Sequence, residues 1–208
     1  MPFEKNVFIN CPFDAQYKKY LKSILFTLIY CDFVPKISET KDSGANRLNE
    51  IVRLIRESKL SIHDLSRMQA KKAGELARFN MPFELGIEIG FRHSGVENFA
   101  IKRCLVIDKR SYRYQASLSD MAGNDIENYG SNTEKLIRVI RNWLIHHNGT
   151  NNLPGASQIW LDYTEFSVDL ESALEKDGFS KKDKESLPRS EFIRLAQDWI
   201  KRIKSSRA

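Results

Sequence analysis

The stretch VFINCPFDAQYKKYLKSILFTLIYCDFVPKIS, residues 7–38, contains the pattern that decides the predicted fold. Residues 7–13 form an apolar run of strand length that includes Pro12. Residues 33–38 form a second short run of this kind. Between them, apolar side chains recur at helical spacing and share one face: Tyr17, Tyr20, Leu21, Ile24, Leu25, Leu28 and Ile29. A strand, a helix and a strand in this order are the repeating unit of a parallel sheet.

The same alternation continues along the chain. A helix is predicted over residues 47–59, a strand over 60–66, a helix from about Asn80, a strand over 104–109 and a helix over 133–147. The first of these helices is expected to bury Leu48, Ile51, Val52 and Ile55. We therefore predict an α/β domain over residues 1–149, with a flavodoxin-like parallel sheet of about five strands and helices on both faces. Residues 117–130 fit none of these elements, and their acids are expected to cap helices or close over the site.

The pattern changes near residue 150. Residues 149–157, GTNNLPGAS, have the composition of a linker, and two amphipathic helices follow over 158–176 and 190–204. Residues 150–208 are therefore predicted to be a C-terminal helical extension. Two arrangements stay open for it: packing on the sheet, or forming a lid or partner surface.

Bulk composition limits the class of protein. The chain has 208 residues, 41% of them hydrophobic, which is enough to bury a core without disulfides. Cys11, Cys31 and Cys104 lie in or beside apolar runs without metal-ligand spacing, so free thiols and a reducing, cytoplasmic compartment are expected. Neither a signal peptide nor a membrane span is predicted. The formal charge of +6 fits a partner that carries phosphate.

Mostly polar residues stand at the end of every predicted strand or directly after it. Ligands of doubly wound sheets bind outside the carboxyl ends of the strands, so these residues are the candidates for a site. They are Asn10, Cys11, Pro12, Phe13 and Asp14; Glu39, Asp42, Ser43, Asn46 and Arg47; His63, Asp64, Ser66 and Arg67; Glu84; and Asp108, Lys109 and Arg110.

Several of these residues have a structural interpretation beside the functional one. Asp14 is a good helix N-cap, and Asp42 fits a turn. Arg47 is either a solvated residue or, like Arg67, a phosphate ligand, because arginine binds phosphate bidentately. Asp64 either caps a loop or binds a sugar hydroxyl.

His63 points away from Asp64 if the strand is regular, and it is expected to be structural. The four histidines lack metal-ligand spacing, so neither a metal nor another cofactor is predicted.

The segment ARFNMPFELGIEIGF, residues 77–91, places two acids in an apolar helix start. Pro82 is tolerated in the first turn. Glu84 and Glu88 are four residues apart and therefore share a face. A glutamate in the first turn is favourable because of the helix dipole, which is the simplest explanation. Gly86 and Gly90 are costly in a helix, so a strand or a ligand is expected to approach them closely.

Three segments resemble a known group of proteins. VFINCPFD (7–14), IHDLS (62–66) and NMPFELGIEIG (80–90) are similar to the nucleoside 2-deoxyribosyltransferase-like and TIR-like superfamilies, and the resemblance covers residues 7–108. It implies that the first strand lines a base pocket, that Asp64 binds the sugar and that Glu84 attacks the anomeric carbon. Both groups cut or transfer at an N-glycosidic bond, and several bacterial members act in anti-phage defence or as toxins.

The predicted catalytic residues are therefore Glu84 and Asp64, in one shared pocket. The predicted substrate-binding residues are Asn10, Pro12, Phe13, Asp42, Arg47, Ser66, Arg67, Asn80 and Met81. The expected function is an N-glycosidase or a deoxyribosyltransferase-like enzyme that cleaves the base–ribose bond of NAD or a nucleotide. The alternative is a non-catalytic TIR-like module that senses a nucleotide or self-assembles, so a homo-oligomer is one expected state. Nucleic acid is not an expected partner, because the basic residues are spread without an aromatic platform.

Overall fold

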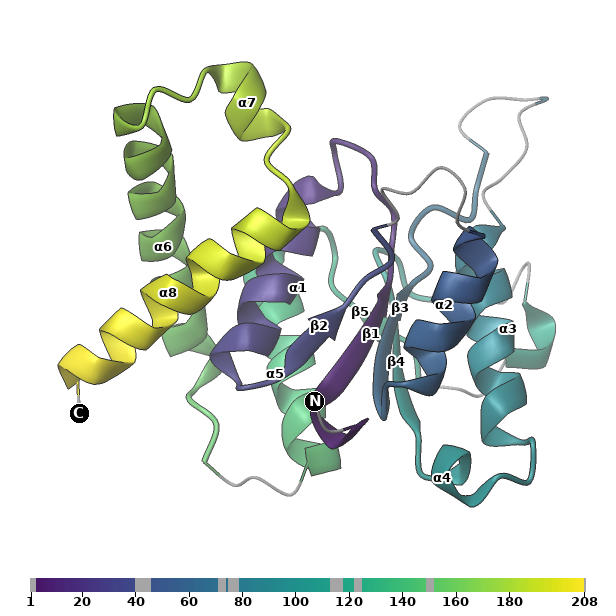
Figure 1. Ribbon diagram of the computed structural model, residues 1–208. Helices are drawn as coiled ribbons and strands as arrows, with labels where there is room; N and C mark the ends of the chain where they lie inside the picture. Colours follow the sequence, from purple (N-terminus) through teal and green to yellow (C-terminus); the bar gives the residue numbers. More distant parts are fainter. Residues whose placement is uncertain are drawn as a thin grey trace.

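The centre of the protein is a five-stranded parallel sheet (Figure 1). The computed structural model describes residues 3–39, 46–70, 74, 79–112, 118–121, 125–148 and 152–207. The strands are β1 (Asn6–Asn10), β2 (Val34–Lys36), β3 (Leu60–Asp64), β4 (Arg103–Asp108) and β5 (Glu127–Asn128). Their order in the sheet is β2-β1-β3-β4-β5. This order and the helices around the sheet confirm the predicted flavodoxin-like α/β fold.

The order of strands reverses beside β1. The chain passes from β1 outward to β2 and then returns to the other side of β1 to form β3. Asn10 of β1 lies opposite His63 of β3, so the carboxyl ends of the two strands are level. The connections that leave these ends diverge to opposite faces, and such a switch point is where this class of fold opens a crevice for ligands.

Helices cover both faces of the sheet. Helices α1 (Lys18–Tyr30) and α5 (Thr133–Asn148) lie on one face, and α2 (Arg47–Arg56) and α3 (Asn80–Arg92) lie on the other (Figure 1). The short helix α4 (Glu97–Ala100) follows α3. Buried Phe8 of β1 packs against Ile51, Leu54 and Ile55 of α2. Leu48 is 42% exposed, so the buried face of α2 is rotated from the predicted one toward Leu54.

The C-terminal helices form a second layer outside α1. They are α6 (Ala156–Lys176), α7 (Lys181–Glu185) and α8 (Arg189–Arg207). Phe26 of α1 stacks on Phe166 of α6 with 5.2 Å between ring centroids, and it also contacts Trp199 of α8. Buried residues from both sides of the predicted boundary near residue 150 belong to one continuous core. Of the two arrangements left open, these helices therefore pack on the sheet domain, through α1 and α5.

Two small elements went unpredicted in residues 117–130. They are the 3-10 turn Ser119–Met121 and strand β5 at the edge of the sheet. Another 3-10 turn, Phe3–Lys5, precedes β1. Within the described part of the chain, no helix combines the length and apolar character needed to cross a bilayer.

Candidate functional site

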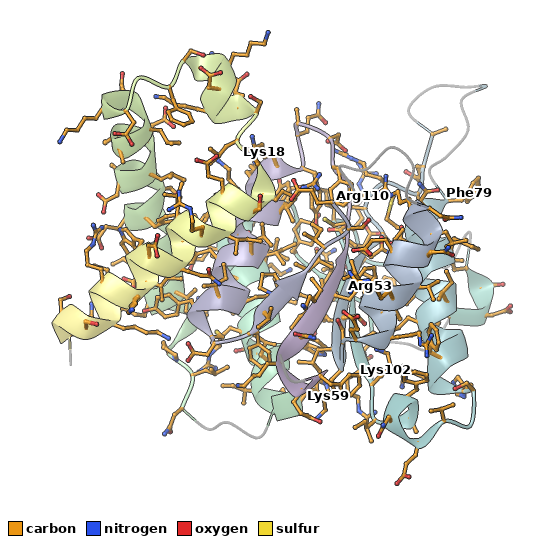
Figure 2. All side chains as sticks on the ribbon, in the orientation of Figure 1. Lys18, Arg53, Lys59, Phe79, Lys102 and Arg110 are labelled. Carbon is orange, nitrogen blue, oxygen red and sulfur yellow. The ribbon has the colours of Figure 1, made fainter. Side chains whose placement is uncertain are left out.

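A cavity of about 550 Å³ opens at the carboxyl edge of the sheet, beside the switch point. Its walls come from β1 and the turn after it, from the end of the segment that follows β2, and from the first turns of α2 and α3. The lining residues are Phe8, Ile9, Asn10, Cys11, Pro12, Phe13, Asp14, Ser38, Arg47, Phe79, Asn80, Met81 and Glu84. Figure 2 shows Phe79 at this edge, whereas Lys59 and Lys102 lie toward the opposite edge.

Two acids, Asp14 and Glu84, line this cavity, and of these two Glu84 is the buried one. Its side chain lines the wall, and the residue is only 8% exposed. No described residue donates a hydrogen bond to its carboxylate and none forms an ion pair with it at close range. Burial raises the pKa of Glu84 from 4.5 to about 7, although the positive charge of Arg47 opposes the rise. The carboxylate is thus desolvated, close to half ionised at neutral pH, and available to a ligand.

The start of α3 is held in place by the end of β1. The side-chain amide of Asn10 donates a 2.8 Å hydrogen bond to the carbonyl of Met81, in the first turn of the helix. Pro82 occupies this first turn, where a missing backbone N–H costs nothing. Met81 and Leu85 are buried against the sheet and fix the rotation of the helix. The hydrogen bond from Asn10 to the Met81 carbonyl and this apolar packing therefore direct Glu84 to the cavity.

Glu88, one turn further along α3, has a different environment. Its carboxylate lies 3.3 Å from the ammonium group of Lys102, and both side chains are fully buried. Lys102 also donates a hydrogen bond of 2.7 Å to the carbonyl of Ile55 and another to that of Ser58. Burial raises the pKa of Glu88 and lowers that of Lys102, while the pairing opposes both effects. Glu88 therefore belongs to a structural ion pair below the cavity.

Asp64 ends β3 and is bonded to three protein groups. It accepts hydrogen bonds from the hydroxyls of Tyr17 at 2.6 Å and Tyr129 at 2.9 Å, and from the amide of Ser66 at 2.7 Å. It is fully buried and is not among the residues that line the cavity with Glu84. Burial raises the pKa of Asp64, and these hydrogen bonds oppose the rise. In this geometry Asp64 ties together the segments before α1 and after β5, as a capping residue does.

His63 points away from Asp64, as the strand geometry predicts. Its ring packs edge-on against Phe8, and its Nδ1 lies 3.0 Å from the side-chain amide of Asn10. Burial, helped by the charge of Lys102, lowers the pKa of His63 to about 3. The imidazole is therefore neutral at physiological pH and orients Asn10, which in turn holds the start of α3.

The two candidate phosphate-binding arginines differ in availability. Arg67 forms a two-pronged ion pair with Asp14, with both contacts at 3.0 Å, and does not line the cavity. Asp14 also accepts a hydrogen bond from the amide of Tyr17 at 3.1 Å, so it caps the turn that leads into α1, whereas the N-cap position of the helix itself is Tyr17. Arg47 lines the cavity, lies over the ring of Phe13, and has no ion-pair partner among the described residues.

Several lining residues were not predicted to bind or act on a substrate. They include Cys11, Ser38 and Phe79. Cys11 directly follows β1 and Ser38 lies two residues after β2, and this position near a strand end is the signal that points to them. Burial raises the pKa of the Cys11 thiol well above its ordinary value. Asp64 and Glu84 add to this rise, and the charge of Arg189 opposes it. The thiol is therefore protonated and lies within electrostatic range of both predicted catalytic acids.

The expected close approach of a strand to Gly86 and Gly90 is wrong. Both glycines are exposed, and no atom of the described residues lies within 4 Å of a Cβ placed at either position. They lie on the side of α3 that faces solvent, away from the cavity-facing side that carries Glu84.

The cavity thus brings together most of the predicted site. The residues that line it are Asn10, Pro12, Phe13, Arg47, Asn80, Met81 and Glu84. Those that the structure places elsewhere are Asp64, Ser66 and Arg67. Asp42 lies outside the described residues. Within the described part of the chain, no three His, Cys, Asp or Glu side chains cluster in a way that could hold a metal ion.

Comparison with known proteins adds no assignment. No protein-family model matches the chain, and no match was found to a curated protein or to a solved structure.

Proposed function

We propose that this protein is an N-glycosidase or deoxyribosyltransferase-like enzyme that cleaves the base–ribose bond of NAD or a nucleotide, with Glu84 as its catalytic carboxylate. One observation carries the proposal: Glu84 is a desolvated carboxylate without a hydrogen-bond partner among the described residues, on the wall of a 550 Å³ cavity. A buried acid of this kind destabilises the fold, so a functional reason for it is expected.

The proposed chemistry uses the carboxylate at the anomeric carbon. The bond between that carbon and the base breaks, and its electron pair leaves with the base. The sugar develops oxocarbenium character, which the negative charge of Glu84 stabilises or captures covalently. Water or a second base then forms the new bond to the same carbon. Because the site is partly desolvated, the charge of the carboxylate acts more strongly than it would in water.

The remaining walls suit the rest of a nucleoside. Phe79 is 63% exposed and lines the cavity, so its ring offers a stacking face for a base. Asn80 offers a side-chain amide to sugar hydroxyls from the first residue of α3. The carboxylate of Asp64 already accepts hydrogen bonds from protein donors. We therefore propose that Asp64 positions the loops around the site and does not contact the sugar directly.

Base release is the direct test. The wild-type chain is incubated with NAD and a panel of nucleosides and nucleotides, and the free base is quantified by chromatography. Glu84→Gln keeps the shape and removes the charge, so the rate should fall at least about 100-fold, as for other electrostatic catalytic groups. Glu97→Gln, at an exposed position on α4, is the matched control and should retain the wild-type rate. Equal rates for wild type and Glu84→Gln would refute the role of this carboxylate.

A second candidate is a non-catalytic nucleotide-sensing module with the same cavity. The observation that favours it is the engagement of Asp64 by three protein donors, which leaves Glu84 as the single predicted catalytic acid on the cavity wall. Calorimetric binding of a nucleotide that stays intact over prolonged incubation would support the module and exclude the enzyme.

A further inference from the structure

Two arginines from distant parts of the chain lie over the same aromatic ring. The guanidinium carbon of Arg189, the first residue of α8, is 4.2 Å from the centroid of Phe13. The corresponding carbon of Arg47, the first residue of α2, is 5.7 Å from it. Phe13 belongs to the turn after β1, at the mouth of the cavity that holds Glu84. The packing of the C-terminal helices on α1 therefore brings a second cation to the candidate site.

Phe13 also forms a wall of a second cavity. This cavity has a volume of about 380 Å³ and lies between the start of α1 and the turn from α7 into α8. It is lined by Arg189, and it shares Pro12, Phe13 and Asp14 with the first cavity. Arg47 lines the first cavity and Arg189 the second. The two guanidinium groups thus lie over Phe13, which forms a wall of both cavities.

Both arginines are available to a new anion. Arg47 has no ion-pair partner among the described residues. Among the described residues, Arg189 has one acidic ion-pair partner, Glu39, whose carboxylate oxygen lies 3.7 Å from its Nη1, which is too long for a strong charged hydrogen bond. The same oxygen accepts a 3.4 Å hydrogen bond from the Arg189 backbone amide. Arg67, in contrast, already forms a two-pronged ion pair with Asp14 through two contacts of 3.0 Å.

We propose that Arg47 and Arg189 together bind a phosphate group of the ligand at Phe13, where the two cavities meet. This inference rests on the proposed function for the nucleotide nature of the ligand. It names phosphorylated compounds as the substrate class and makes the C-terminal helices part of the site. A planar guanidinium can donate two parallel hydrogen bonds to two phosphate oxygens. Stacking on the Phe13 ring keeps the guanidinium in a fixed orientation.

The phosphate can come from a mononucleotide or from a dinucleotide. In a mononucleotide it would lie beside Phe13 and leave the second cavity to solvent. In a dinucleotide such as NAD, the pyrophosphate would pass over Phe13 and the second nucleoside would enter the second cavity. That cavity offers apolar Leu21, Leu25 and Phe192 together with Lys18 and Lys22.

Calorimetry measures the binding of inorganic pyrophosphate and phosphate to the full chain. It tests the proposed two-arginine phosphate site without knowledge of the base. Arg47→Gln and Arg189→Gln should each weaken pyrophosphate binding about 10-fold or more, as expected for loss of a charged hydrogen-bonding group. Their combined effect in the double variant should deviate from additivity, because both groups touch one anion. Arg56→Gln on α2 and Arg194→Gln on α8, which are exposed positions on the same helices, are the controls and should bind as wild type does.

A second measurement separates phosphate recognition from an indirect effect on the pocket. Wild type and Arg189→Gln are titrated with a nucleoside, its 5′-monophosphate and NAD, after circular dichroism has shown that the variant is folded. The substitution should weaken binding of the two phosphorylated ligands and leave nucleoside binding unchanged. A loss for NAD that exceeds the loss for the monophosphate identifies the dinucleotide as the source of the phosphate. Equal weakening of all three ligands, or wild-type affinity for pyrophosphate in both single variants, would overturn the proposal.

The outcome does not depend on turnover. If no base is released from any substrate but pyrophosphate binding needs both arginines, the proposed enzymatic function fails and the phosphate site stands. If Glu84→Gln abolishes base release while Arg189→Gln changes neither pyrophosphate nor NAD binding, the enzyme stands and the two-arginine site is refuted.

Discussion

Replacing Glu84 by glutamine should make the protein more stable at alkaline pH. The carboxylate is buried in the cavity wall without a hydrogen-bond donor among the described residues, so its ionisation is disfavoured in the folded chain. Between pH 4.5 and about 7 the folded chain holds a proton at this position that the unfolded chain has already released. The free energy of unfolding of the wild type therefore falls as pH rises through this range. Glutamine has a similar shape and does not titrate, so the variant lacks this loss.

The magnitude follows from the two pKa values. A tenfold change in the ionisation equilibrium corresponds to about 1.36 kcal/mol, so moving the pKa from 4.5 to about 7 costs the wild type about 3 kcal/mol above pH 7. At pH 5 the same calculation leaves a cost of only about 1 kcal/mol. The difference in stability between Glu84→Gln and wild type should therefore grow by about 2 kcal/mol in favour of the variant from pH 5 to pH 8.

Urea unfolding at pH 5, 6, 7 and 8, followed by circular dichroism, measures this difference. Asp64 and Glu88 are also buried acids with raised pKa values, but both proteins contain them, so their titration cancels in the comparison. Glu97→Gln, at an exposed position, should show no such pH dependence. A stability difference that stays constant from pH 5 to pH 8 would refute the reasoning, because Glu84 would then ionise as easily in the folded chain as in the unfolded one.

Three further predictions concern the groups around the site. Lys102→Met should lower the free energy of unfolding by about 3–5 kcal/mol, because Glu88 is left buried without its cation. Adding Glu88→Gln should restore most of this loss, as measured by urea unfolding. A double variant as unstable as Lys102→Met would contradict this. Tyr129→Phe removes one hydroxyl donor from Asp64 and should cost about 1–3 kcal/mol in the same assay, whereas an unchanged midpoint would exclude the bond. Burial raises the pKa of the Cys11 thiol, so Cys11 should be alkylated at pH 8 far more slowly in the folded chain than in urea. Peptide mass spectrometry measures the two rates, and equal rates would show that the thiol is accessible in the folded chain.

The proposed role of Glu84 agrees with its energetic cost. A glutamine or an apolar residue at this position would avoid the cost of burying a charge, and the charge of Arg47 offsets that cost only in part. Glu88 shows how the same helix neutralises a buried acid when its role is structural, since Lys102 lies 3.3 Å away. The contrast between the two acids on α3 is therefore the physical basis for placing the chemistry at Glu84.

Local patterns in the sequence were enough to predict the class of fold. Strand-length apolar runs alternate with helical periodicity, and residues such as Ile24 and Leu28 are buried as the pattern requires. The rule that ligands of doubly wound sheets bind at the carboxyl ends of the strands then predicted the position of the candidate site, because residues that follow β1 and begin α3 meet at this edge. Strand β5 was missed because two residues, Glu127–Asn128, are too few to show a period.

Only the tertiary structure decided which polar groups face the cavity. Helical spacing placed Glu84 and Glu88 on one side of α3, but the partner of Glu88 is Lys102, from the turn before β4. Arg189 carried no signal as a site residue, because it reaches Phe13 through the packing of α6 and α8 against α1. Periodicity reports which side of an element is buried, whereas the pairing of charges depends on which distant segments that burial brings into contact.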